Sequence, residues 1–93
     1  AEIVGQKLRS LGTRHQTLCI THLPQIAAFS EHHYVVSKAQ HRNATFTSIE
    51  RLQTSDEKTA ELAKLLGSSE VASKAQQLAR DMLARARVLS LTT

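Results

Sequence analysis

Residues 17–25 limit the fold more than any other stretch, because an apolar run is followed at once by two polar residues and then by proline. The run Leu18-Cys19-Ile20 is too short for a helix and shows no alternation of apolar and polar residues. It therefore predicts a strand over residues 17–21 that is buried on both faces. Pro24 suits the first position of a helix, where its missing N–H costs no hydrogen bond. The stretch thus predicts a strand, an abrupt turn and a short helix, with His22 at the turn.

The composition is that of one small domain with a modest core, since the chain has 93 residues. The formal net charge of +4 is compatible with a polyanionic partner but specifies none. No apolar run is long enough to cross a bilayer, so no membrane partner is expected. Cys19 is the single cysteine and can form no internal disulfide. It is expected to be a buried small hydrophobe in a reducing, cytoplasmic compartment.

The chain begins directly in a helical pattern over residues 1–12, with an apolar stripe and with Gly12 as a plausible carboxyl-terminal cap. Neither a capping residue nor an initiator methionine comes first. We expect the chain to be a fragment of a longer protein, with a trimmed terminus as the alternative. The stripe comprises Ile3, Val4, Leu8 and Leu11.

Two segments after the short helix predict an antiparallel hairpin. Residues 33–39 are rich in strand-forming residues, and residues 44–52 follow after a polar loop of three to five residues. The strands 17–21 and 33–39 flank the short helix, so they are expected to be parallel and joined by a right-handed crossover.

Two helices complete the chain. Thr54 and Glu57 have the spacing of a capping box, and Gly67 ends the helix that they open. Ser68 and Ser69 are expected to cap a last helix from about Glu70 to Leu89, with an apolar stripe of Val71, Ala75, Leu78, Met82, Ala86 and Leu89. The predicted fold class is α/β: a partial mixed sheet, made of a parallel pair and a β-hairpin, with flanking helices in the order α-β-α-β-β-α-α.

His22 is the leading candidate for chemistry. In open α/β sheets, ligands bind at the carboxyl ends of strands, and helix N-termini favour anions. An imidazole there can donate or accept a hydrogen bond near neutral pH. The alternative is that His22 only satisfies a neighbouring carbonyl.

Other catalytic and metal sites lack their motifs. The five histidines show no ligand-pair spacing, so no metal site is predicted. Neither a glycine-rich phosphate loop nor a nucleophile elbow is present. Because an Asp-rich strand end that could hold Mg²⁺ is also missing, the set needed for a complete nucleotidase is absent.

The last helix carries a basic face that could meet DNA phosphates. Asp81 interrupts this face and no aromatic residue accompanies it, which favours a solvated surface. The open alternatives are therefore a small nucleic-acid-binding module and an interaction domain whose last two helices pack against a partner. The candidate DNA-binding residues are Lys74, Arg80, Arg85 and Arg87.

Residues 18–28 and 32–38 closely resemble the end of the RecN family of bacterial DNA-repair proteins, which are SMC-like, ABC-class ATPases. Residues 1–8 resemble the helix after the Walker B strand and D-loop of that family, and residues 61–67 resemble its penultimate helix. The resemblance implies that residues 1–93 are the carboxyl-terminal segment of an ABC-type, P-loop NTPase head, with the H-loop and the final helices.

The resemblance gives His22 the role of the switch-loop histidine, which contacts the γ-phosphate of ATP, with Thr21 and Gln25 beside it at the nucleotide. ATP and Mg²⁺ are then ligands of the intact head and are not expected to bind strongly to this chain alone. The Walker A, signature and Walker B motifs would lie before Ala1, so the chain by itself is expected to hydrolyse no ATP.

The resemblance also implies partners. These are the remainder of the head, a second head in an ATP-sandwiched homodimer, and DNA during double-strand break repair and recombination in the nucleoid. The strand 17–21 would lack its neighbour here, and an unpaired apolar edge is a template for self-association.

Overall fold

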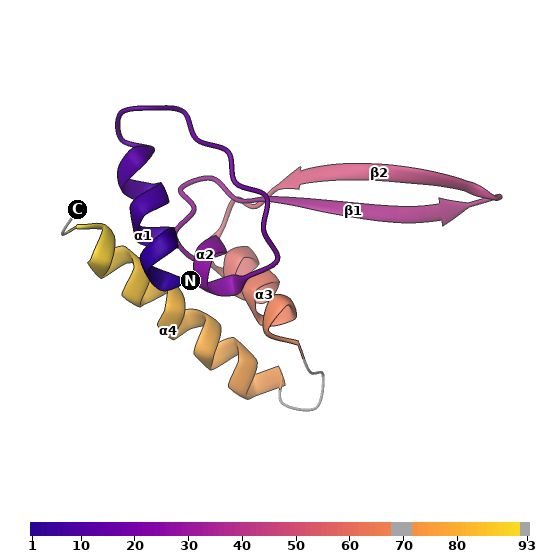
Figure 1. Cartoon of the computed structure of the whole chain (residues 1–93). Helices are drawn as coiled ribbons and strands as arrows, with labels where there is room; N and C mark the ends of the chain where they lie inside the picture. Colours follow the sequence, from indigo (N-terminus) through magenta and orange to yellow (C-terminus); the bar gives the residue numbers. More distant parts are fainter. Residues whose placement is uncertain (68–71, 92–93) are drawn as a thin grey trace.

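The computed structural model describes residues 1–67 and 72–91, and the elements follow the order α-α-β-β-α-α (Figure 1). The predicted caps Ser68 and Ser69, and the predicted helical positions Glu70 and Val71, lie outside the described residues. No helix among the described residues is long and apolar enough to cross a membrane. The elements are α1 (Glu2–Leu11), α2 (Pro24–Ala27), β1 (Tyr34–His41), β2 (Ala44–Arg51), α3 (Ser55–Leu66) and α4 (Ala72–Ser90).

The predicted strand over residues 17–21 is wrong, and with it the parallel pair. This segment is an irregular connection, and the sheet of the described chain contains only β1 and β2. Leu18 and Ile20 are 88% and 94% exposed, and Cys19 is exposed rather than buried. A strand is stabilised by ladder hydrogen bonds to a neighbouring strand. The segment 17–21 was expected to lie parallel to β1, but β1 pairs with β2. Figure 1 shows the connection arching past α1 before it returns to α2.

The predicted hairpin is present, with a tighter turn than expected. β1 and β2 pair antiparallel in continuous register from Tyr34↔Arg51 to His41↔Ala44. The loop is two residues, Arg42 and Asn43, with φ of 50° and 65°. Positive φ at both central positions is the type I′ geometry, whose twist matches that of the strands and so permits the two-residue loop.

Helix α3 begins and ends as predicted. The Thr54 hydroxyl accepts a hydrogen bond from the Glu57 N–H (3.1 Å), and a Glu57 carboxylate oxygen accepts one from the Thr54 N–H (3.0 Å). The same carboxylate oxygen accepts from the Gln53 N–H (3.2 Å). Gly67 ends the helix with φ of +83°, a conformation that residues with a side chain rarely adopt.

The core lies where α2, α3 and α4 meet, with Leu62 and Ala79 fully buried. The apolar stripe predicted for the last helix is partly wrong: Met82, Ala86 and Leu89 pack as expected, but Leu78 is 50% exposed and Ala79 takes the buried position. α3 packs beside this helix, and a small side chain at Ala79 permits a close approach of the two helices. The buried apolar residues are Ala27, Ala28, Phe29, Leu62, Ala79 and Ala86.

The stripe predicted for α1 packs only in part, since Leu8 is half-buried. Ile3, Val4 and Leu11 are exposed, and Gly5 is the buried residue of the helix. An added Cβ at Gly5 would lie 2.5 Å from Cδ2 of Phe29, so the glycine permits α1 to approach the aromatic ring that ends the α2 segment.

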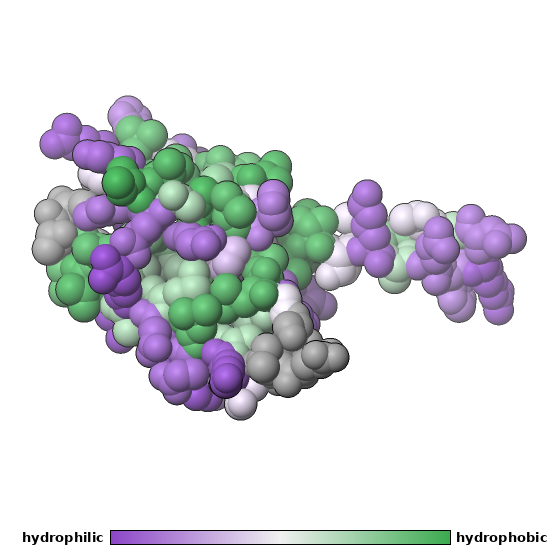
Figure 2. Space-filling model, turned by 60° about the horizontal axis from the view of Figure 1, so that its bottom comes forward, coloured by the Kyte–Doolittle hydropathy of each residue, from purple (hydrophilic) through white to green (hydrophobic). Residues whose placement is uncertain are grey.

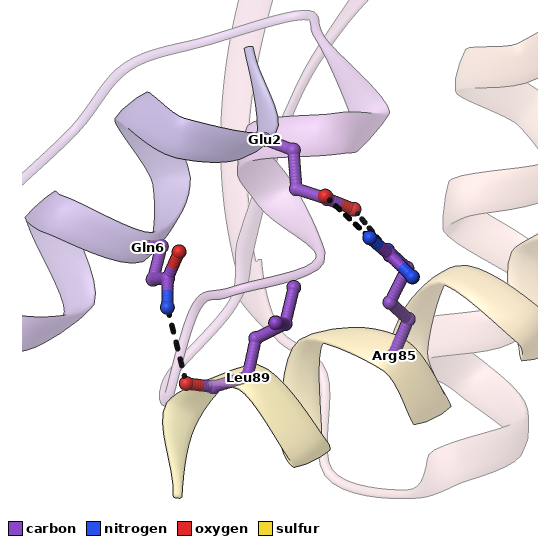
Figure 3. Close-up of polar contacts among 4 residues, drawn as sticks. All are labelled: Glu2, Gln6, Arg85 and Leu89. Carbon is purple, nitrogen blue, oxygen red and sulfur yellow. Dashed lines mark hydrogen bonds and ion pairs between the residues drawn. The ribbon is translucent and has the colours of Figure 1, made fainter. Parts of the chain in front are cut away.

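Polar contacts join α1 to α4 (Figure 3). Arg85 donates from Nε to Glu2 Oε2 (2.6 Å) and from Nη2 to Glu2 Oε1 (3.1 Å). Gln6 donates from Nε2 to the carbonyl of Leu89 (3.4 Å). The first and last helices are therefore side by side, and these contacts and the close approach at Gly5 attach α1 to the body, whereas most of its apolar stripe is exposed.

Candidate functional site

The turn that carries His22 is stabilised by local hydrogen bonds. The Thr21 hydroxyl accepts from the Leu23 N–H (3.0 Å), and the Leu23 carbonyl accepts from the N–H groups of Ile26 (3.1 Å) and Ala27 (3.0 Å). Leu23 is extended and Pro24 opens α2, as the sequence predicted for this proline. The turn therefore holds the backbone on both sides of His22.

The His22 side chain is exposed. Within the described part of the chain its imidazole has no hydrogen-bond partner, so the alternative that it satisfies a neighbouring carbonyl is not observed. An imidazole with both nitrogens available can donate to a phosphate oxygen or accept from a hydroxyl.

The other two predicted nucleotide-binding residues differ in their surroundings. Thr21 is half-buried, and its hydroxyl oxygen already accepts the hydrogen bond from the Leu23 N–H within the turn. Gln25 is exposed in the first turn of α2. Both lie within three positions of His22, so the fold keeps this triplet on one short segment.

Buried residues fix the segment after His22 to the body. Pro24, Ala27, Ala28 and Phe29 are buried, and the Phe29 carbonyl accepts a hydrogen bond from Arg9 Nη1 (3.0 Å). The backbone that follows His22 is therefore packed against the body, whereas residues 17–20, just before the turn, are exposed.

The exposed connection borders a groove of about 560 Å³ that also contacts α1, α3 and the start of β1. The apolar residues of the predicted strand, Leu18, Cys19 and Ile20, line it together with Thr21, whereas His22 lies outside it. The groove and the imidazole are therefore separate features.

His33 provides a contrast with His22. It is half-buried, and desolvation lowers its pKa, an effect that Lys58 strengthens and Glu61 opposes. This histidine faces the body of the protein at the base of the hairpin. The described residues hold no cluster of three or more potential metal ligands.

The four predicted DNA-binding residues do not form one surface. Arg85 is paired with Glu2, and hydrogen bonding between the two lowers the pKa of Glu2 and raises the pKa of Arg85. Lys74 is exposed elsewhere on α4. Arg80 and Arg87 line a groove of about 520 Å³.

Two further cations of this groove, Arg9 and Lys58, were not predicted. They come from α1 and α3, and nothing in the linear sequence links them to α4. The carboxylates Glu31 and Asp56 line the same groove and oppose the binding of an anion.

Comparison with known proteins finds relatives that are named as DNA repair proteins. No family model matches it. It is 46% identical over 83 residues to the DNA repair protein RecN of Xylella fastidiosa (strain 9a5c), covering 89% of this chain and 15% of that protein. For RecN of Haemophilus influenzae the identity is 42% with the same coverage, and for RecN of Bacillus subtilis it is 30% over 92 residues, or 99% of this chain and 16% of that protein. The chain thus spans about 15% of the length of these relatives. By these similarities it belongs to the RecN family, and it corresponds to the carboxyl-terminal part of those proteins.

Proposed function

We propose that the chain is the part of a RecN-type ATPase head that presents His22 to the γ-phosphate of ATP, in a protein that acts in DNA double-strand break repair and recombination. The observation that carries the proposal is an exposed imidazole without an internal partner, in the stretch that resembles the switch loop of ABC-class ATPases. The relatives are DNA repair proteins by name, which supports the biological role.

The expected chemistry of His22 is electrostatic and orienting. An N–H of the ring donates to a γ-phosphate oxygen, where negative charge must be stabilised during phosphoryl transfer. Gln25, exposed one turn away, offers an amide to the same ligand. Most residues that bind ATP and Mg²⁺ belong to parts of the head that are not in this sequence, so the 93 residues alone provide the contacts of His22 and Gln25 and no complete catalytic centre.

The proposed partners are the remainder of the same head, a second head in an ATP-sandwiched homodimer, and DNA. The apolar connection 17–21 is exposed, which supports association through this segment even though it is not a strand. Light scattering of the chain over a range of concentrations tests this association, and a monomer at every concentration contradicts it.

The test of the His22 role is ATP turnover by the intact RecN-type protein that contains these residues. His22→Ala should lower kcat on the order of 100-fold, the typical effect of removing one donor that stabilises developing charge. His15→Ala is the matched control, since His15 is also exposed. Unchanged turnover in His22→Ala, with a native circular dichroism spectrum, refutes the role.

Nucleic-acid binding through α4 is the weaker alternative. Arg85 is neutralised by Glu2, and the groove that contains Arg80 and Arg87 also contains two carboxylates. The basic face seen in the sequence is therefore divided and partly compensated in the folded chain.

A further inference from the structure

The hairpin formed by β1 and β2 is an arm that projects from the helical body (Figures 1 and 2). Residues 36–51 are all exposed, so both strands and both faces are open to solvent. An eight-residue strand extends about 27 Å at the usual rise of 3.4 Å per residue. The arm is long enough to reach a partner that the body does not touch.

The outer half of the arm is cationic. Its cations are Lys38 and Arg42, and no acidic residue occurs between Glu31 and Glu50. The register places Lys38 opposite Thr47 and Gln40 opposite Thr45. Directly opposed residues share a face. One face of the tip thus combines an ammonium with three side chains that can form hydrogen bonds, and Figure 2 shows that the far end of the arm is hydrophilic.

Arg42 occupies a position that its own conformational preference disfavours. It has φ of 50° at the first central position of a type I′ turn, where Asn, Asp and Gly are preferred. Asn43, with φ of 65°, suits its position because Asn tolerates the left-handed region. The turn therefore places a guanidinium at the extreme tip against local propensity, and backbone strain of this kind is concentrated at functional sites.

From this charge and exposure we infer that the hairpin arm docks on double-stranded DNA, with Lys38 and Arg42 contacting backbone phosphates. A two-stranded ribbon fits the major groove of B-DNA, which is about 12 Å wide. Threonine, glutamine and asparagine side chains also donate to phosphate oxygens. The choice of DNA as the polyanion rests on the proposed function in DNA repair, whereas the charge and exposure of the arm do not depend on it.

The arm is better suited to a polyanion than the groove of α4. The groove contains Glu31 and Asp56, which repel phosphates, and the outer half of the arm contains no carboxylate. The two surfaces come from separate elements, so single experiments can distinguish them.

The test is fluorescence anisotropy of a labelled random-sequence DNA duplex titrated with the full chain, without ATP, between about 50 and 200 mM salt. The double variant Lys38→Gln, Arg42→Gln should raise Kd on the order of tenfold at the lower salt and reduce the salt slope by about 0.9 for each lost contact. The control Lys7→Gln, Arg14→Gln removes the same charge from exposed positions on and after α1, and it should change Kd less than about twofold, because distant charges are screened.

A second variant separates binding from folding. Arg42→Asn replaces the strained residue with a preferred one, so the Tm should stay or rise while DNA binding weakens. Arg42→Lys keeps the charge and should retain most of the binding.

Three results overturn the inference: no duplex binding by the parent chain, equal weakening in the Lys7, Arg14 control, or weakening in Arg80→Gln, Arg87→Gln without any in the hairpin variant. Because the assay contains no ATP, its outcome is independent of the His22 role. If ATP turnover depends on His22 but the hairpin variant binds DNA as well as the parent chain does, the DNA-docking inference is refuted and the proposed role of His22 stands.

Discussion

Arg85 and Glu2 stand 83 positions apart in the chain and form a two-point ion pair that joins α4 to α1 (Figure 3). The pair lowers the pKa of Glu2, and hydrogen bonding to Arg85 is the largest cause. It also occupies a cation that the sequence offers only as a candidate DNA contact. This one contact therefore joins the first helix to the last, and it separates Arg85 from Arg80 and Arg87, the cations of α4 that line the groove.

Breaking this pair should weaken the attachment of α1. Arg85→Gln and Glu2→Gln should each lower the Tm slightly, and the double variant should lower it by less than the sum, because both changes remove the same interaction. The effect should shrink at high salt, since the groups are exposed and screened. Arg87→Gln, a cation of the same helix outside the pair, is the control for thermal melts. Additive losses would show that the two residues do not interact.

Gly5→Ala should destabilise the protein by about 1–3 kcal/mol, the usual range for overpacking. The new Cβ would lie 2.5 Å from Cδ2 of Phe29, and this ring is buried and cannot move freely. Gly12→Ala is the matched control, because Gly12 has a helical φ of −63° and its nearest neighbours would be 3.3 Å away. Urea denaturation of both variants measures the difference, and equal midpoints would contradict the close approach of α1 to Phe29.

Leu62→Ala should cost about 2–5 kcal/mol, since the side chain is fully buried and its removal leaves a cavity. Leu78→Ala should cost much less, because Leu78 is half exposed. Chemical denaturation of the two variants compares the same chemical change at the two positions. A larger loss at Leu78 would favour the stripe that the sequence predicts over the packing that the fold shows.

Glu57→Gln should make the stability of the protein depend less on pH between neutral and acidic conditions. Backbone hydrogen bonds from Gln53 and then Thr54 lower the pKa of Glu57 in the folded chain. Its contribution is therefore fully present above the unfolded pKa and is lost as pH falls through the lower, folded pKa. Glutamine can keep the capping box but does not titrate. Tm values measured from neutral to acidic pH should fall less in the variant than in the parent, and identical slopes would argue against this coupling.

Features that depend on near neighbours in the sequence were predictable. The capping box of Thr54 and Glu57, the helix that Pro24 opens and the end of α3 at Gly67 each involve residues within a few positions of one another. The hairpin belongs to the same group, although the two-residue turn at Arg42 and Asn43 was not expected, because that pair is not a usual type I′ sequence. His22 could likewise be placed at a turn, and its role is supported by family resemblance rather than by spacing.

The order of residues alone is enough to predict the four helical segments, the start of α2 at Pro24 and both ends of α3. It also carries the resemblance to RecN. The packing of the folded chain decides that Leu18 and Ile20 are exposed and that Ala79 rather than Leu78 is buried. It also pairs Arg85 with Glu2 and leaves Lys38 and Arg42 of the hairpin exposed to solvent. The physical reason is that helix caps and turns are satisfied within one segment. Burial, ladder pairing and charge compensation need a second surface, which another segment must provide.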